Sequence, residues 1–276
     1  MAGDGTVGKA MDVLDQVASY GRPVRFATLL ADSPFPKATL YRFLQTLTNQ
    51  RLLAYDAENH TYSVGVRLVR LAHAAWQQAS LAPLARPHLD ALSHQIGLTV
   101  HLAQLDHGQV LYVDKRNASR PVAMYSDAGK IGPAYCTGVG KAMLAYLPED
   151  TRAHMIRQQS FHRFTSGTLA NPRALEEELG RIVARGHAYD REEHEPGIIC
   201  LAVPIRSGAG QVLGGLSITA STKDTSLDGL AQHANALHQT AQAIADDAET
   251  WRSPGHLSAA DRADGQYINT IEGGAR

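Results

Sequence analysis

The sequence predicts an α+β protein built from two domains, and three features of the chain support this prediction. Near the amino end, apolar residues recur at three- and four-residue spacing, which is typical of amphipathic helices. Beyond Gly97 the spacing changes to the alternation of β-strands. The length of 276 residues suits two ordinary domains, and the composition, 44% hydrophobic and 19% charged, is that of a globular protein.

The amino-terminal part reads as three helices followed by a β-hairpin. An apolar stripe runs along each helix, and in the third helix it includes Leu40, Leu44 and Leu47. Gly21 and Pro23 end the first helix. The expected elements are helices over residues 7–20, 26–32 and 37–50 and strands over residues 52–55 and 61–64. This order predicts a winged helix-turn-helix, whose third helix enters the major groove of DNA.

A further helix is expected over residues 66–79. Its apolar face is broader than an isolated linker needs, so a partner helix is implied, and we expect this linker to carry a dimer interface. Pro83 and Pro87 interrupt the chain next, which places the domain boundary within residues 79–83. The expected limits are residues 1–65 for the first domain, 66–80 for the linker and 81–251 for the second domain, with a tail over residues 252–276.

The second domain is expected to be an antiparallel sheet with helices packed on it. Polar turns at residues 106–108 and 207–210 separate strand-like runs, and short turns favour antiparallel pairing. The expected strands cover residues 99–105, 109–114, 122–125, 198–205 and 212–219. One expected helix ends at Gly97, and three others cover residues 138–147, 172–185 and 227–251. From residue 252 onward Ser, Gly, Asp and Ala dominate without a period, which predicts a disordered tail.

Basic and hydroxyl side chains gather on and near the third helix. Residues 1–70 contain eight Lys and Arg and six Asp and Glu, a net excess of +2 in a chain whose overall charge is −1. The candidate DNA-contacting residues are Arg25, Lys37, Thr39, Tyr41 and Arg42. For Arg42, a bidentate contact to guanine and an ion pair to phosphate are both open. The alternative is a charged solvent face on an ordinary three-helix bundle.

Several segments resemble the signatures of a known family. Residues 36–47, PKATLYRFLQTL, are similar to the recognition helix of the IclR family, and residues 62–65 with Leu68 resemble its wing and the exit into its linker helix. Residues 97–103, 135–142 and 186–205 resemble further signatures, in the expected order, so that the resemblance extends from about residue 7 to residue 251. Residues 41–46, 124–126 and 133–141 are similar to the subgroup of ketodeoxygluconate repressors of sugar-acid catabolism.

The resemblance implies a GAF-like sensor fold in the second domain, with a pocket for a small carboxylate effector. A sugar acid or keto acid is the first expectation and a small aromatic acid the second. The pocket positions of the family fall on Gly138, Val139, Asp190, Cys200, Ser217 and Thr219. Backbone N–H groups at the helix start near Gly138 suit a carboxylate, and the hydroxyls of Ser217 and Thr219 suit its other polar atoms. Asp190 suits ligand hydroxyls, and the branched Val139 stands where relatives often carry a small residue, which affects the size of the pocket.

Other interpretations of these residues stay open. Ser217 and Thr219 could face solvent or a neighbouring strand, and Cys200 could be an inert core thiol. Gly138 could be no more than the glycine that starts a helix. The two cysteines form no C-x-x-C pair, so we expect reduced thiols and neither a disulfide nor a redox site.

Catalytic, nucleotide-binding, cofactor and metal sites are not predicted. Residues 138–142 differ from a phosphate-binding loop, because that motif needs Gly in place of Tyr135 and Ser or Thr in place of Ala142. The 13 histidines show none of the close spacings of metal ligands. A hydrolase site built on Cys136 or Cys200 would leave the amino-terminal module unexplained.

Two hypotheses about function follow. The first is a DNA-binding transcriptional regulator, expected to repress a catabolic operon, that binds double-stranded operator DNA as a homodimer or a dimer of dimers and responds to the effector. The second is a metabolite-binding enzyme or storage protein with an amino-terminal oligomerisation module. Because no apolar run approaches the ~20 residues of a membrane span and no signal-peptide pattern opens the sequence, we expect a cytoplasmic protein without a membrane partner.

Overall fold

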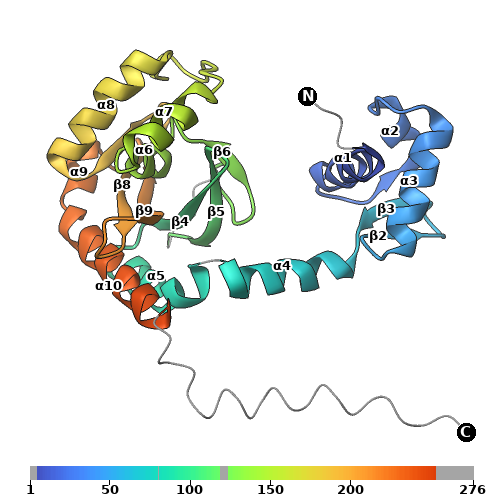
Figure 1. Cartoon of the computed structure of the whole chain (residues 1–276), viewed down its shortest axis with the longest axis horizontal. Helices are drawn as coiled ribbons and strands as arrows, with labels where there is room; N and C mark the ends of the chain where they lie inside the picture. Colours follow the sequence, from blue (N-terminus) through green and yellow to red (C-terminus); the bar gives the residue numbers. More distant parts are fainter. Residues whose placement is uncertain (1–4, 80, 119–123, 253–276) are drawn as a thin grey trace, which may run out of the picture. The chain divides into compact units, whose positions relative to one another are not determined.

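The computed structural model describes residues 5–79, 81–118 and 124–252, and the chain divides into two compact units, Met1–Ser80 and Leu81–Arg276 (Figure 1). Two of the residues in the strand expected over residues 122–125, and residues 253–276 of the expected tail, lie outside the described residues. The strand prediction is wrong for the rest of that segment, because neither Met124 nor Tyr125 lies in a strand. The backbone N–H of Tyr125 instead donates to Oε1 of Glu195 at 2.8 Å.

The first unit contains the three expected helices and the hairpin, and adds one short strand. Its helices are α1 (Gly5–Ser19), α2 (Phe26–Ala31) and α3 (Lys37–Asn49), and its strands are β1 (Val24–Arg25), β2 (Leu53–Asp56) and β3 (Thr61–Val64). The strands form an antiparallel sheet in the order β1-β3-β2. The sequence does not predict β1, because a strand of two residues is too short to show a period.

The core of the first unit explains which side of α3 faces outward. Leu40 and Leu44 are fully buried, and they pack in one cluster with Leu29 of α2 and Val13 of α1. Burial of each leucine contributes roughly 1.5–3 kcal/mol to folding. Because the apolar stripe faces this core, the polar residues of α3 lie on the opposite side of the helix.

Helix α4 (Val66–Ala79) follows β3 after one residue, Gly65. A Cβ atom at Gly65 would lie 2.2 Å from the backbone oxygen of Arg51, so the tight connection requires glycine. Three large apolar side chains of α4 are exposed within this unit, Val66, Val69 and Leu71. Val66 and Val69 are three residues apart and share one face of the helix, which indicates a surface that another molecule can cover.

The second unit is a six-stranded antiparallel sheet in the order β6-β5-β4-β9-β8-β7. Its strands are β4 (Thr99–Asp106), β5 (Gln109–Arg116), β6 (Ile131–Pro133), β7 (Ala188–Arg191), β8 (Ile198–Arg206) and β9 (Val212–Ser221). Its helices are α5 (Ala82–Ile96), α6 (Gly138–Leu144), α7 (Glu149–Arg157), α8 (Pro172–Arg185), α9 (Leu227–Ala231) and α10 (Ala234–Arg252). The predicted pairing of the last two long strands is confirmed.

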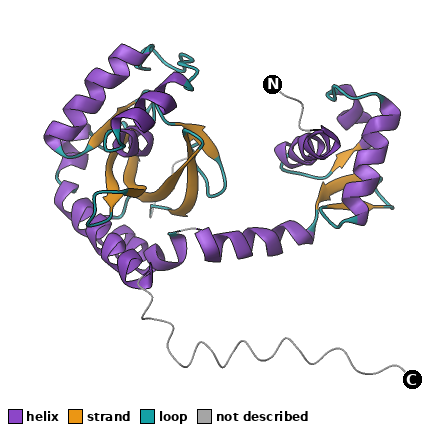
Figure 2. Ribbon diagram, viewed as in Figure 1, coloured by secondary structure: helices purple, strands orange, loops and turns teal. Residues whose placement is uncertain are grey.

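The two faces of this sheet are covered by different helices (Figure 2). Helix α6 packs on one face, against β8 and β9, and α5 and α10 pack together on the other. Alternate residues of each strand therefore face α6, among them Cys200 and Ala202 of β8. In the part of the chain that the structure describes, no helix is long and apolar enough to cross a membrane.

Two helices differ from the bounds that the sequence predicts. The helix expected over residues 138–147 stops at Leu144. The next residues form 3₁₀ turns, in which the N–H of Leu147 donates to the oxygen of Leu144, and Pro148 then disfavours the helical conformation of the residue before it. The helix expected over residues 227–251 is two helices, α9 and α10. Between them the backbone N–H of His233 donates to the oxygen of Leu230, three residues earlier, as in a 3₁₀ turn. The apolar spacing of the sequence continues across this break, so the sequence does not reveal it. The sequence also does not predict strands β6 and β7 or helix α7.

Candidate functional site

The outer side of α3 carries cationic side chains that are free to meet a partner. Lys37 and Arg42 are exposed on this helix, and Arg25 is exposed on β1. Within the described residues, none of the three has a carboxylate within ion-pairing distance. Tyr41 is 54% exposed, while Thr39 is half-buried. The five residues expected to contact DNA therefore lie on one small unit, and four of them are exposed.

An open hollow of about 580 Å³ lies between the start of α3 and the hairpin β2–β3. It is lined mainly by aromatic rings, and its lining residues are Phe26, Lys37, Ala38, Tyr41, Tyr55, His60 and Tyr62. The hydroxyl of Tyr55 is 2.9 Å from Nδ1 of His60, which fixes the hairpin side of the hollow. Sequence reasoning does not single out Tyr55 or His60. The sequence feature that could have indicated this hollow is the pair of aromatic rings, Tyr55 and Tyr62, on either side of the polar turn of the hairpin.

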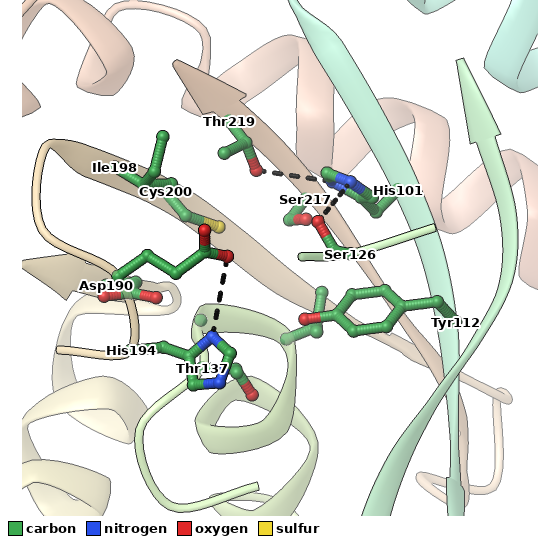
Figure 3. Close-up of a pocket in the computed structure, with 13 residues that line it drawn as sticks. His101, Tyr112, Ser126, Thr137, Asp190, His194, Ile198, Cys200, Ser217 and Thr219 are labelled. Atoms are coloured by element: carbon green, nitrogen blue, oxygen red, sulfur yellow. Dashed lines mark hydrogen bonds and ion pairs between the residues drawn. The ribbon is translucent and has the colours of Figure 1, made fainter. Parts of the chain in front are cut away.

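A second cavity lies in the other unit, between α6 and the sheet (Figure 3). All six residues expected to bind an effector line it, which are Gly138, Val139, Asp190, Cys200, Ser217 and Thr219. Seven further residues complete the lining, which are His101, Tyr112, Ser126, Thr137, His194, Glu195 and Ile198. The void itself is only about 30 Å³, well below the volume of about 150 Å³ of a cavity that holds a benzene molecule. A ligand of that size must therefore displace side chains or loops as it enters.

Strand register brings the polar side chains of the pocket together. Asp190 pairs with Cys200 across β7 and β8, and Cys200 pairs with Thr219 across β8 and β9. His101 pairs with Ser217 across β4 and β9, in the next row along the same face. Ser217 and Thr219 are both buried, so the alternative in which they face solvent is wrong.

His101 holds two hydroxyl groups of the pocket. Its Nε2 is 2.9 Å from Oγ of Ser126, and its Nδ1 is 3.3 Å from Oγ1 of Thr219. Burial, helped by the nearby charge of Lys115, lowers the pKa of His101 to about 3, so the ring is neutral. A neutral imidazole has one donor and one acceptor nitrogen, so one hydroxyl donates to the ring and the other accepts from it. The accepting hydroxyl keeps its own proton for a ligand.

A buried ion pair lies next to Asp190, outside the lining of the pocket. Lys141 of α6 donates to Oε1 of Glu193, and both side chains are buried. The backbone N–H of Glu193 donates to Oδ1 of Asp190 at 2.7 Å. Burial raises the pKa of Asp190 to about 7, although the charge of Lys141 opposes this change. At neutral pH the carboxyl of Asp190 can thus act as a hydrogen-bond donor or as an acceptor.

The structure also explains why residue 138 is a glycine and why the thiol of Cys200 is neutral. A Cβ atom at Gly138 would lie 2.7 Å from Sγ of Cys200, so the start of α6 approaches β8 as closely as it does only because it has no side chain there. Burial raises the pKa of the Cys200 thiol to about 12, which keeps it neutral. Among the described residues, no group of three His, Cys, Asp or Glu side chains is placed to hold a metal ion.

Comparisons with known proteins agree with this two-part architecture. The family described as IclR helix-turn-helix domain matches residues 6–57, and the family described as Bacterial transcriptional regulator IclR C-terminal matches residues 73–246. The chain is 33% identical over 208 residues to the HTH-type transcriptional regulator KdgR of Escherichia coli (strain K12), covering 75% of this chain and 79% of that one. It is 32% identical over 210 residues to KdgR of Dickeya chrysanthemi, covering 76% and 69% of the two chains. The crystal structure of the Thermotoga maritima IclR is similar with a TM-score of 0.72 and 26% identity, covering 87% of this chain and 97% of that one.

Proposed function

Because the chain belongs to the IclR family of bacterial transcriptional regulators, we propose that it represses a catabolic operon and that a small sugar acid or keto acid controls its binding to operator DNA. The protein is a DNA-binding transcriptional regulator and not an enzyme, so the alternative of an enzyme or storage protein is not kept. Its similarity to two KdgR proteins supports the assignment to the subgroup of ketodeoxygluconate repressors. We place its action in the cytoplasm, where its operator would lie.

The observation that carries the DNA-binding part of the proposal is the free, exposed pair of cations on α3, Lys37 and Arg42. The buried stripe through Leu40 and Leu44 holds the helix against its own core and turns these side chains outward. A recognition helix needs this arrangement to reach base edges and phosphates in the major groove. The aromatic hollow beside the start of α3 extends the same surface toward the hairpin.

The exposed apolar face of α4 supports a homodimer, as the regulator requires. Two-fold operators need two reading heads at a fixed separation. Val66 and Val69 are 75% and 68% exposed within one chain, and a second copy of α4 is a partner that can cover both. A dimer of dimers would add contacts through other surfaces.

The composition of the pocket supports a small, oxygen-rich carboxylate as the effector. The hydroxyls of Ser217 and Thr219 and the amide groups at the first turn of α6 are donors for a carboxylate. Asp190 is suited to the hydroxyl groups of a sugar acid or the oxo group of a keto acid, depending on its protonation. Because the void is smaller than such a ligand, binding must move the elements that line it, and this movement supplies a route to the DNA-reading unit.

The test is a binding titration with the promoter region that adjoins the protein's own gene. Replacement of Arg42 by Ala should weaken binding by about 1–3 kcal/mol and, if Arg42 contacts phosphate, reduce the salt slope by about one. Arg173→Ala is the matched control, because Arg173 is exposed on α8 in the other unit and its ion pair among the described residues is with Glu177. Equal DNA affinity of the Arg42 and Arg173 variants would exclude α3 as the reading helix. A panel of sugar acids, keto acids and small aromatic acids, added to the wild-type complex, tests the effector class in the same assay.

A further inference from the structure

The hydroxyl of Tyr112 is a donor in the pocket that the fold does not use. Tyr112 lies on β5, and its side chain is only 6% exposed. Its ring packs edge-on against His101, with ring centroids 5.5 Å apart. Figure 3 shows its hydroxyl pointing into the cavity. In the described part of the chain this hydroxyl has no hydrogen-bond partner.

A hydroxyl that faces the cavity and has no partner among the described residues is open to a ligand. Most polar side-chain atoms inside native proteins have a partner, and here a molecule in the cavity can supply it. Three other hydroxyls of the pocket are anchored, Ser126 and Thr219 by His101 and Thr137 by the backbone oxygen of Pro133. The hydroxyl of Tyr112 differs from these three, because its whole hydrogen-bonding capacity is available to a ligand in the cavity.

The surroundings of Tyr112 decide what kind of atom it can meet. Burial raises the pKa of Tyr112 above its ordinary value, and the nearby Cys200, Asp190 and Glu195 raise it further. The hydroxyl is therefore protonated at physiological pH and acts as a donor. The donors that suit the carboxylate are those of Ser217, Thr219 and the first turn of α6. The acceptor left for Tyr112 is therefore an oxygen of the effector outside its carboxylate, either a hydroxyl or a carbonyl.

We propose that Tyr112 is a specificity-determining residue of the effector pocket, whose hydroxyl donates to an uncharged hydroxyl or carbonyl oxygen that the effector carries in addition to its carboxylate. The protein then distinguishes hydroxy and oxo acids from the plain carboxylic acids of the same length. This inference rests on the proposed role of the pocket as the effector site. It adds a discriminating contact that neither the sequence motifs nor the six expected pocket residues include.

The experiment compares matched ligands on matched variants. Binding of 2-oxobutanoate, 2-hydroxybutanoate and butanoate, and of gluconate as a longer hydroxy acid, is measured by calorimetry on the full chain. The wild type should bind the oxo or hydroxy acid about tenfold more tightly than the plain acid, and Tyr112→Phe should remove that preference by weakening only the oxygen-bearing ligand. Tyr146→Phe is the control, because Tyr146 stacks with Arg206 in a separate groove of the same unit.

Each outcome separates this inference from the proposed function. If Tyr112→Phe binds the acids with the wild-type preference, the role of Tyr112 is wrong although the pocket still binds carboxylates. If the wild type binds none of these acids, both this inference and the proposed effector class are overturned. The urea midpoint gives a second readout, because removal of an unused hydroxyl should leave it unchanged or raise it. A clearly lower midpoint would show that the hydroxyl has a structural partner and would also overturn the inference.

Discussion

Lys141 and Glu193 form an ion pair beneath the pocket, with 0% and 3% of their side chains exposed. The pair joins α6 to the loop after β7, and the backbone of Glu193 in turn holds the carboxyl of Asp190. Within the described residues, Oε2 of Glu193 has no hydrogen-bond partner, so Lys141 is the main compensation for this buried charge. The position of Asp190 in the pocket thus depends on an ion pair that lies outside it.

Loss of one partner of this pair should be strongly destabilising. Lys141→Met removes the close cation of the buried Glu193 carboxylate and leaves Arg191, 3.9 Å away, as a weaker one, and we expect a loss of about 3–5 kcal/mol in the free energy of unfolding. The double variant Lys141→Met, Glu193→Gln should recover part of that loss, because no uncompensated charge is left. Urea unfolding measures both. Lys223→Met is the control on an exposed lysine, and a Lys141 variant as stable as this control would show that the pair is not buried in solution.

The close packing of α6 predicts opposite effects of two glycine substitutions. A Cβ atom at Gly140 would lie 2.4 Å from the backbone oxygen of Ala134, so Gly140→Ala must shift backbone and should cost about 1–3 kcal/mol. Gly180, in the middle of α8, has open space around it, and Gly180→Ala should stabilise the protein by about 0.8–1 kcal/mol. Thermal unfolding of the two variants checks the contrast. Equal effects of the two substitutions would contradict the tight contact of α6 with the segment before it.

The regular helices could be predicted from the sequence because their signals are local. The stripe through Leu40 and Leu44 marks the inner side of α3, and Gly186 ends α8 in the left-handed conformation that glycine favours. Helices α3 and α8 accordingly agree with their expected bounds to within one residue.

Much of the pocket could not be predicted, because its contacts join distant parts of the chain. His101 contacts Thr219 across a separation of 118 residues, and only the pairing of β4 with β9 brings them together. In the sequence, His101 and Tyr112 sit inside apolar strand runs and look like ordinary core positions. The six expected pocket residues follow from the resemblance to a family. Such a resemblance indicates which distant residues share a pocket even where the strand pairing cannot be predicted.

The exposed apolar face of α4 predicts that a charged residue placed on it weakens the dimer. Val69 is 68% exposed within one chain, and burial of a valine against a second copy contributes about 1.5–3 kcal/mol. Val69→Glu should therefore weaken dimerisation at least tenfold, which sedimentation equilibrium measures. Val183→Glu on α8, where the side chain is 51% exposed, is the matched control. A dimer unaffected by Val69→Glu would place the interface on another surface.

The protonation of Asp190 predicts that effector binding depends on pH. Burial raises the pKa of Asp190 from its ordinary value of 3.8 to about 7, so the carboxyl is neutral below about pH 7 and charged above it. A carboxylate effector meets a neutral group at low pH and a like charge at high pH, and its affinity should fall between about pH 6 and pH 8. His101 and Cys200, with pKa values of about 3 and about 12, do not titrate in this range.

Stability should follow the same direction, because the native state keeps a proton that the unfolded chain releases. The contribution of Asp190 to the free energy of unfolding is complete below about pH 4 and is lost as the pH rises through about 7. Asp190→Asn should flatten both the affinity and this part of the stability profile, whereas Asp150→Asn, at an exposed position of α7, should leave both unchanged. An Asp190→Asn variant with the wild-type slope would assign the pH dependence to another group. The other charged groups that face Asp190 are Lys141, Glu193 and Glu195, so Glu195→Gln is the next variant to measure in that case.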